Sequence, residues 1–389
     1  MLISISLILI SGFLLGELCK KIKFPSLFGM IIAGIIIGPS LLNLLDGSIL
    51  NISTEIRRIA LIIILIRAGL KLNITDLKKV GRPAVMMCFV PACFEILGMA
   101  LLAPKFLGLS LIDSLILGAV VGAVSPAVVV PRMIKLIDEG RATDKAIPQM
   151  ILTGASVDDV FVIVMFTTFT GIAKGESVSI KSFVNIPVSI ILGIIVGALC
   201  GIILSSVFSK FKLSTTVKSI IILAVTFILN WVEDAQKIVA FSGLIAIMAM
   251  GTAIKKKNDS QAKSISNVFD KLWVGAEIFL FVLLGASVKV ESLKSAGLSS
   301  VLLVFCVLGF RMIGVFVCTL GTKLSLKEKL FTMLAYTPKA TVQAAIGGLP
   351  LAMGLDCGQT VLTVSVIAIL LTAPLGAFAI DLTYKKLLE

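Results

Sequence analysis

Residues 122–131 have the sequence GAVSPAVVVP, and residues 336–343 have the sequence YTPKATVQ. Each stretch places a proline, Pro126 or Pro338, inside a long apolar segment, where a proline removes a backbone donor and interrupts the helix. Two interrupted apolar segments in corresponding positions of a chain are the best sequence indication of a transporter's binding site. We therefore predict two broken membrane helices that cross, although an ordinary kink is the alternative for either proline alone.

The composition of the chain is that of a membrane protein. Of its 389 residues, 58% are hydrophobic and 15% are charged, and it contains no histidine. Soluble domains average about 45–50% apolar and about 25% charged residues, so this composition argues against a water-soluble enzyme. Without histidine the chain cannot build Ser-His-Asp, Cys-His or histidine-ligated metal sites. We expect no enzyme activity and no cofactor.

A membrane-spanning helix needs roughly 20 apolar residues, and such windows recur along the chain. Thirteen are predicted, near 1–19, 27–45, 56–70, 83–103, 112–132, 146–173, 184–209, 216–232, 237–254, 270–288, 295–320, 328–353 and 359–382. The two interrupted segments are the fifth and the twelfth, an odd offset that implies repeats of opposite orientation. We expect a first inverted repeat at 1–182 (helices 1–6, with core helices 4–6), a linker helix at 183–212, and a second repeat at 213–389 (helices 8–13, with core helices 11–13).

The positions of the basic residues predict the orientation of the chain in the membrane. Lys and Arg are about three times as frequent in the loops of one side as in those of the other, and the bias alternates loop by loop. The positive-inside rule then places the N-terminus outside and the C-terminus in the cytoplasm. The net charge of +13 is dispersed along this membrane face, which argues against nucleic-acid binding. The first window lacks the features of a signal peptide, so we expect it to be a helix of the mature protein.

Two adjacent carboxylates lie in the middle of the sixth window, where residues 153–160 have the sequence TGASVDDV. Neighbouring residues on a helix point about 100° apart, so Asp158 and Asp159 face different surroundings. Two carboxylates in a low dielectric do not both ionise easily, which allows one of them to carry a proton at working pH. A carboxylate is also the hard oxygen ligand that Na⁺ or Li⁺ prefers. We expect Asp158 and Asp159 to hold either a proton or a monovalent cation, unless the window is in fact a misjudged helix end.

Three further ionisable residues lie within the predicted spans. Arg311, in the eleventh window, stays protonated in proteins and therefore needs a buried counter-charge. The candidates are Glu95, Asp158 and Asp159. Lys339 follows the second helix break, where two roles are equally open: neutralising the carbonyl ends of the broken helix, or handling the ion directly.

Several of these stretches together resemble a known family. They are 65–70 (LIRAGL), 122–131, the pair Asp158–Asp159, 326–329 (LKEK) and 338–347 (PKATVQAAIG). The chain resembles the monovalent cation/proton antiporter superfamily, and most closely its NHA branch of sodium/proton exchangers. The resemblance implies an NhaA-like, all-α fold of 13 transmembrane helices. It also implies a homodimer in which a core domain moves against a dimer domain like an elevator.

The resemblance also implies roles for individual residues. Asp159 would be the essential cation- and proton-carrying carboxylate, with Asp158 as its neighbour, and Arg311 would pair with Glu95. The residues expected at the broken-helix crossing are Ser125, Pro126, Pro338 and Lys339. The polar residues expected to line the site are Thr153, Ser156, Thr341 and Gln343. We expect exchange of Na⁺ or Li⁺ for H⁺ in a bacterial cytoplasmic membrane, with membrane lipids and monovalent cations as partners. The alternatives are a K⁺/H⁺ antiporter, a Na⁺-coupled solute symporter, a ligand-gated K⁺ efflux system and a membrane scaffold without transport.

Overall fold

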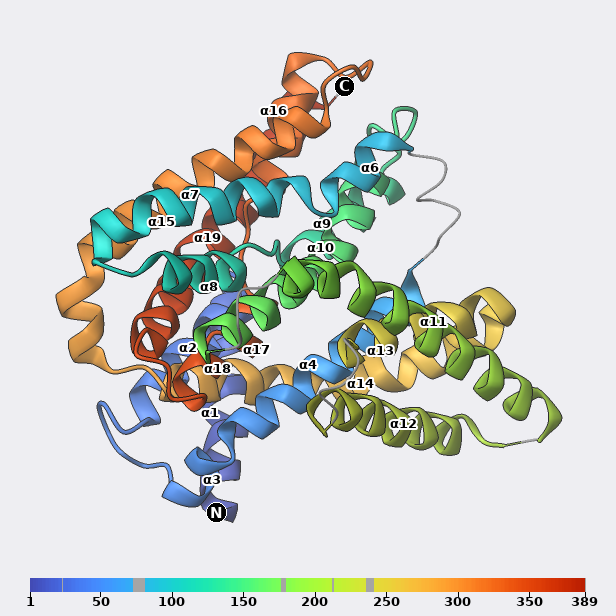
Figure 1. The fold of residues 1–389 in the computed structure, drawn as a ribbon, viewed down its shortest axis with the longest axis horizontal. Coiled ribbons are helices and arrows are strands. Elements are labelled where there is room, and N and C mark those ends of the chain that lie inside the picture. Colours follow the sequence, from blue (N-terminus) through green and yellow to red (C-terminus); the bar gives the residue numbers. More distant parts are fainter. Residues whose placement is uncertain (23, 73–80, 176–179, 212, 236–240, 389) are drawn as a thin grey trace. The chain divides into compact units, whose positions relative to one another are not determined.

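The computed structural model describes the chain apart from residues 23, 73–80, 176–179, 212, 236–240 and 389, and it leaves out the side chains of 156, 180–187, 234, 290 and 292–296. In the described part, all regular secondary structure is helical (Figure 1). The helices are α1 (Leu2–Lys21), α2 (Ser26–Ile37), α3 (Gly47–Asn51), α4 (Ser53–Lys71), α6 (Arg82–Met87), α7 (Val90–Leu107), α8 (Leu111–Val121), α9 (Pro126–Asp138), α10 (Ile147–Ala173), α11 (Ile180–Lys210), α12 (Thr215–Ala235), α13 (Gly243–Lys257), α14 (Asp259–Ala286), α15 (Val290–Cys318), α16 (Leu326–Ala335), α17 (Thr341–Ile346), α18 (Leu349–Ala352) and α19 (Gly358–Leu387).

Apolar helices long enough to cross a membrane recur along this sequence of elements. Eight such stretches occur among the described residues: Leu2–Lys21, Arg82–Leu107, Leu111–Asp138, Ile147–Ala173, Val188–Lys210, Thr215–Glu233, Gly297–Cys318 and Gly358–Leu387. The protein is therefore an all-helical, multi-pass membrane protein, as the composition predicted. Each of the thirteen predicted windows lies at least in part on helical residues, but the number thirteen stays a prediction.

The chain folds into two compact units. The first comprises residues 1–57, 75–174 and 278–389, and the second comprises residues 58–74 and 175–277. All residues predicted for the ion site belong to the first unit, although they come from two distant stretches, 95–159 and 311–343. The predicted boundaries at 182 and 212 separate inverted repeats, whereas these two units are defined by the contacts within them. The repeat boundaries therefore stay predictions.

Two helices of the first unit are interrupted at Pro126 and Pro338. Residues 122–125 separate α8 from α9, and residues 336–340 separate α16 from α17. Pro126 occupies the first position of α9, where its missing N–H costs nothing and its fixed φ favours a new helix. The two interruptions contact each other, because the backbone N–H of Ser125 donates to the carbonyl of Pro338 at 2.7 Å.

A third interruption was not anticipated from the sequence. Helix α6 ends at Met87 and α7 begins at Val90, within the window 83–103 that we predicted as one uninterrupted span. Pro91 lies in the first turn of α7. Because Pro91 has no N–H, the carbonyl of Met87, four residues earlier, lacks the partner that a continuous helix would provide.

Glycines allow close approach of the helices that carry the site. A Cβ added at Gly118 of α8 would lie 3.0 Å from the Cα of Ile96 in α7, and one at Gly314 of α15 would lie 2.8 Å from the Cα of Pro91 in α7. Small residues at such crossings bring helix backbones together in membrane proteins. Helix α7 therefore packs between α8 and α15, and Figure 1 shows α7 running alongside α15.

Candidate ion-binding site

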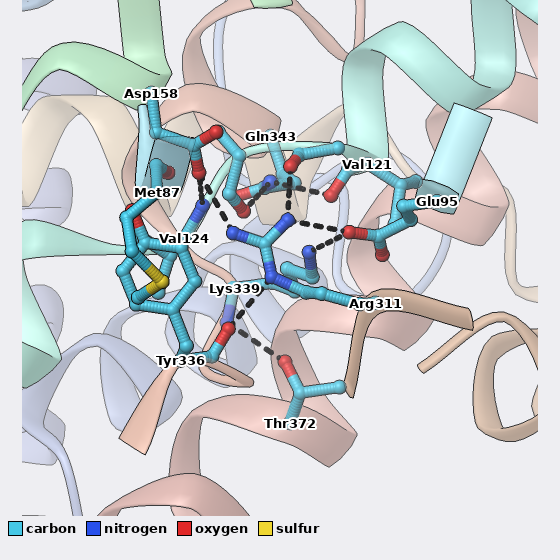
Figure 2. Close-up of polar contacts among 12 residues, drawn as sticks. Met87, Glu95, Val121, Val124, Asp158, Arg311, Tyr336, Lys339, Gln343 and Thr372 are labelled. Atoms are coloured by element: carbon cyan, nitrogen blue, oxygen red, sulfur yellow. Dashed lines mark hydrogen bonds and ion pairs between the residues drawn. The ribbon is translucent and has the colours of Figure 1, made fainter. Parts of the chain in front are cut away.

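Five buried ionisable side chains of the first unit gather around the helix interruptions, and Figure 2 shows four of them: Glu95, Asp158, Arg311 and Lys339. Glu95 comes from α7, Asp158 and Asp159 from α10, Arg311 from α15, and Lys339 from the segment between α16 and α17. Each is at most 5% exposed. Because burying a charge is expensive unless it is paired and hydrogen-bonded, the contacts among these groups determine what the site can hold.

Arg311 lies at the centre of the cluster and uses all three guanidinium nitrogens. Its Nη1 is 2.7 Å from Oε2 of Glu95, its Nη2 is 2.7 Å from Oδ2 of Asp158, and its Nε donates to the carbonyl of Tyr336 at 2.6 Å. The Nη1 group also donates to the carbonyl of Gly122. Of the three carboxylates that the sequence offered as counter-charges, the structure thus pairs two, Glu95 and Asp158, with Arg311.

The contact to Gly122 has a specific origin in the sequence. Pro126 lies four residues after Gly122 and has no N–H, so the carbonyl of Gly122 loses its helical partner. Arg311 fills that position, and Nε2 of Gln343 donates to the neighbouring carbonyls of Val121 at 3.1 Å and Ala123 at 2.9 Å. The carbonyl ends of the broken helix are therefore neutralised by a guanidinium and an amide.

Lys339 pairs with Glu95 of α7. Its Nζ lies 2.5 Å from Oε2 of Glu95, so its ammonium pairs with a carboxylate. At the end of α16, the carbonyl of Tyr336 accepts instead from Nε of Arg311. The backbone N–H of Lys339 donates to Oγ1 of Thr372 in α19 at 2.8 Å, which fixes the extended segment against that helix.

The two aspartates have different surroundings. Asp158 is fully buried, and its Oδ2 accepts hydrogen bonds from Arg311 and from the N–H of Val124 at 2.9 Å. Asp159 is 5% exposed and is not among the groups bonded to Arg311. Within the described residues, Oδ1 of each aspartate is buried and has no hydrogen-bond partner. Asp158 is thus held on one side only, and Asp159 is the less constrained of the two.

Further oxygen atoms near the interruptions also lack partners. Among the described residues these are Oγ of Ser125, Oγ1 of Thr341 and Oε1 of Gln343, all buried. Hydroxyl, amide and carboxylate oxygens are the donor set that hard cations take, so the residues present fit a monovalent cation as cargo. Thr153 is buried on α10, and the side chain of Ser156 lies outside the described residues.

The cluster contains one more carboxylate than it contains cations. Arg311 and Lys339 are two cations, and Glu95, Asp158 and Asp159 are three carboxylates. With all five ionised, the cluster carries one excess negative charge. One proton or one monovalent cation neutralises it, and two together do not fit the charge balance.

Sequence reasoning missed two contributors to this arrangement. Tyr336 supplies a carbonyl and a ring to Arg311, whose Cζ lies 4.9 Å from the ring centroid, and Thr372 anchors Lys339. The signal for Tyr336 was its place two residues before Pro338 in a chain with only two tyrosines. No local signal pointed to Thr372, which lies 33 residues from its partner.

A multi-pass helical protein with paired carboxylates and two buried cations at interrupted helices belongs to the class of ion-coupled membrane transporters. Residues 5–386 match the family model described as "Sodium/hydrogen exchanger, transmembrane". The chain belongs to this family of monovalent cation/proton antiporters. Its relatives are exchangers, so the protein is a transporter rather than an enzyme.

The relatives share most of the chain. Sodium/hydrogen exchanger 9B2 of Xenopus tropicalis is 35% identical, over all of this chain and 75% of its own length, and the human protein of the same name is 32% identical, over 98% and 73%. The solved structure of the sodium proton antiporter MjNhaP1 from Methanocaldococcus jannaschii at pH 8 is similar in fold. It has a TM-score of 0.87 and 24% identity, and the match covers 98% of this chain and 97% of that one.

Proposed function

We propose that the protein exchanges Na⁺ or Li⁺ for H⁺ across the membrane at Asp158 and Asp159. The observation that carries this proposal is a buried cluster of three carboxylates and two cations, which holds one excess negative charge when all five groups are ionised. A proton and a monovalent cation compensate that charge equally, so they compete for the same carboxylates. The unpartnered Oδ1 atoms of the two aspartates support this assignment, because an oxygen without a donor is available to either one.

Competition of this kind leads to exchange without covalent chemistry. With the site open to one side, a cation displaces the proton from Asp159, while Asp158 stays oriented by Arg311 and by the amide of Val124. The loaded site opens to the other side, releases the cation and takes up a proton. One charge replaces one charge in each half of the cycle, so we propose a 1:1, electroneutral exchange.

The architecture that we propose around this site follows from the two contacting interruptions. The segments 122–125 and 336–340 would be the crossing point of two broken helices in a set of 13 spans built from inverted repeats. The short polar contact between Ser125 and Pro338 supports such a crossing. We further propose a core domain that carries the site and moves like an elevator against a dimer domain, within a homodimer. The N-terminus would lie outside and the C-terminus in the cytoplasm of a bacterial cell.

Reconstitution tests the proposal directly. The purified protein is placed in proteoliposomes with a trapped pH-sensitive dye, and Na⁺, Li⁺ or K⁺ is added outside. We expect Na⁺ and Li⁺ to drive proton movement out of the vesicles, at a rate that is unchanged when K⁺ and valinomycin clamp the voltage. A rate that depends on the clamp would contradict 1:1 exchange, a response to K⁺ alone would indicate a K⁺/H⁺ antiporter, and no response to any of the three cations would overturn the proposal.

A further inference from the structure

Tyr336, in the interruption between α16 and α17, makes three contacts with two residues. Its side chain is fully buried, and it is one of the two tyrosines in the chain. Its hydroxyl contacts Met87, whereas its ring and its backbone carbonyl both contact Arg311 (Figure 2). None of these groups belongs to the charge cluster itself.

The hydroxyl of Tyr336 donates to the backbone carbonyl that has no helical donor because of Pro91. It donates to the carbonyl oxygen of Met87 at 2.9 Å, the group that lacks a helical donor because Pro91 has no N–H. A buried carbonyl without a donor is unfavourable, particularly in a membrane. This hydrogen bond therefore holds the hydroxyl end of the Tyr336 ring against the kink between α6 and α7.

The other two contacts of Tyr336 hold Arg311. Its carbonyl accepts from Nε at 2.6 Å, and its ring lies beneath the guanidinium, with Cζ 4.9 Å from the ring centroid. A planar guanidinium held along one edge and on one face has a fixed orientation. That orientation directs Nη2 to Oδ2 of Asp158. Fixing Oδ2 leaves Oδ1 of Asp158 as the unpartnered oxygen.

A glycine in α10, the helix that carries Asp158, leaves room for the hydroxyl of Tyr336. Gly154 lies four residues before Asp158, on the same face of α10. A Cβ at Gly154 would lie only 2.5 Å from the hydroxyl oxygen of Tyr336. No side chain larger than hydrogen fits there without displacing that hydroxyl. The glycine at position 154 is therefore required for the hydroxyl of Tyr336 to lie where it does.

We propose that Tyr336 is a positioning residue of the exchange site: anchored by its hydroxyl to the kink at Met87, it orients Arg311, and through Arg311 it presents Oδ1 of Asp158 to the cation. This inference rests on the proposed exchange activity. A ring that only filled space would need neither the hydroxyl contact nor the glycine opposite it. The inference therefore concerns the hydroxyl, which can be removed without changing the ring.

The test compares Tyr336→Phe with Tyr384→Phe in proteoliposomes. Tyr384 is the only other tyrosine and is also buried, near the C-terminal end of α19, so its substitution is the matched control. We expect Tyr336→Phe to raise the KM for Na⁺ by about three- to tenfold, the effect of one lost hydrogen bond, with little change in maximal rate. Tyr384→Phe is expected to leave both constants unchanged. A purely structural role would instead lower the maximal rate, through loss of active protein, and leave the KM unchanged.

Two outcomes overturn the inference while exchange itself stands. One is a KM for Tyr336→Phe equal to that of the wild type, and the other is an equal rise in KM for Tyr384→Phe. If Tyr336→Phe yields no monodisperse protein, Gly154→Ala displaces the hydroxyl but keeps the tyrosine, and the same rise in KM is expected; an unchanged KM there also overturns it. Absence of exchange in the wild type is a different result, which refutes the proposed function instead.

Discussion

Replacement of Arg311 by lysine keeps the charge of the cluster but removes the guanidinium fork. Arg311 uses three nitrogens to reach two carboxylates and two backbone carbonyls. A lysine ammonium is a single point that cannot reach all four acceptors. We expect Arg311→Lys to keep one carboxylate contact and to leave the carbonyls of Gly122 and Tyr336 without their donor. Each buried acceptor without a partner costs about 1–3 kcal/mol, so the free energy of unfolding is expected to fall by about 3–5 kcal/mol.

Thermal unfolding of the purified protein in detergent measures this loss. The expected decrease is about 4–6 °C in the midpoint, together with a higher KM for Na⁺ in proteoliposomes. Arg132→Lys is the control, since Arg132 forms a partly exposed ion pair with Asp381 at 3.0 Å, and such pairs contribute only about 0–1 kcal/mol. The reasoning is refuted if Arg311→Lys unfolds at the same temperature as Arg132→Lys and transports with the wild-type KM.

Two further predictions concern packing and pH. Gly34→Ala would place a Cβ 2.0 Å from a backbone oxygen of α14, whereas nothing lies within 4 Å of a Cβ at Gly309; we expect Gly34→Ala to destabilise by about 1–3 kcal/mol and Gly309→Ala to be neutral or slightly stabilising in the same melting assay. Glu328 begins α16, and burial raises the pKa of its carboxyl, but the hydrogen bonds from Lys145 and from Ser325 outweigh burial and hold the pKa below its usual value of 4.5. The stabilisation from this carboxylate is complete above pH 4.5 and disappears as the pH falls through the lowered pKa. Glu328→Gln is therefore expected to lower the melting midpoint at pH 7 and to flatten its acid dependence; an unchanged acid dependence would contradict this.

The helix interruptions could be predicted from the sequence because their cause is local. Pro126 and Pro338 remove backbone donors wherever the chain folds, and the structure interrupts the helices beside them. The same rule applied to Pro91 would have located the kink at Met87, but that proline lies near the start of a window and was not singled out. The paired aspartates could also be found locally, because two carboxylates within an apolar segment are conspicuous.

The pairing of the charges could not be predicted, because it depends on contacts between distant parts of the chain. Lys339 pairs with Glu95, 244 residues away, and Arg311 pairs with Asp158, 153 residues away. Sequence reasoning identified the charges but not which cation meets which carboxylate. It placed Lys339 beside the second helix break without fixing its role, whereas the carbonyls of Gly122 and Tyr336 accept from Arg311. Local patterns thus locate breaks and charges, and helix packing determines their partners.

The central claim is that a proton and a cation compete for the carboxylates of α10. Asp159→Asn tests it most directly, since the amide keeps the size of the side chain but holds neither the excess charge nor an exchangeable proton. The control is Asp381→Asn, at an exposed position paired with Arg132. With ΔpH-driven Na⁺ uptake measured in proteoliposomes, the account predicts that Asp159→Asn abolishes exchange and that Asp381→Asn retains it. Na⁺ uptake by Asp159→Asn at the rate of the control would contradict the account.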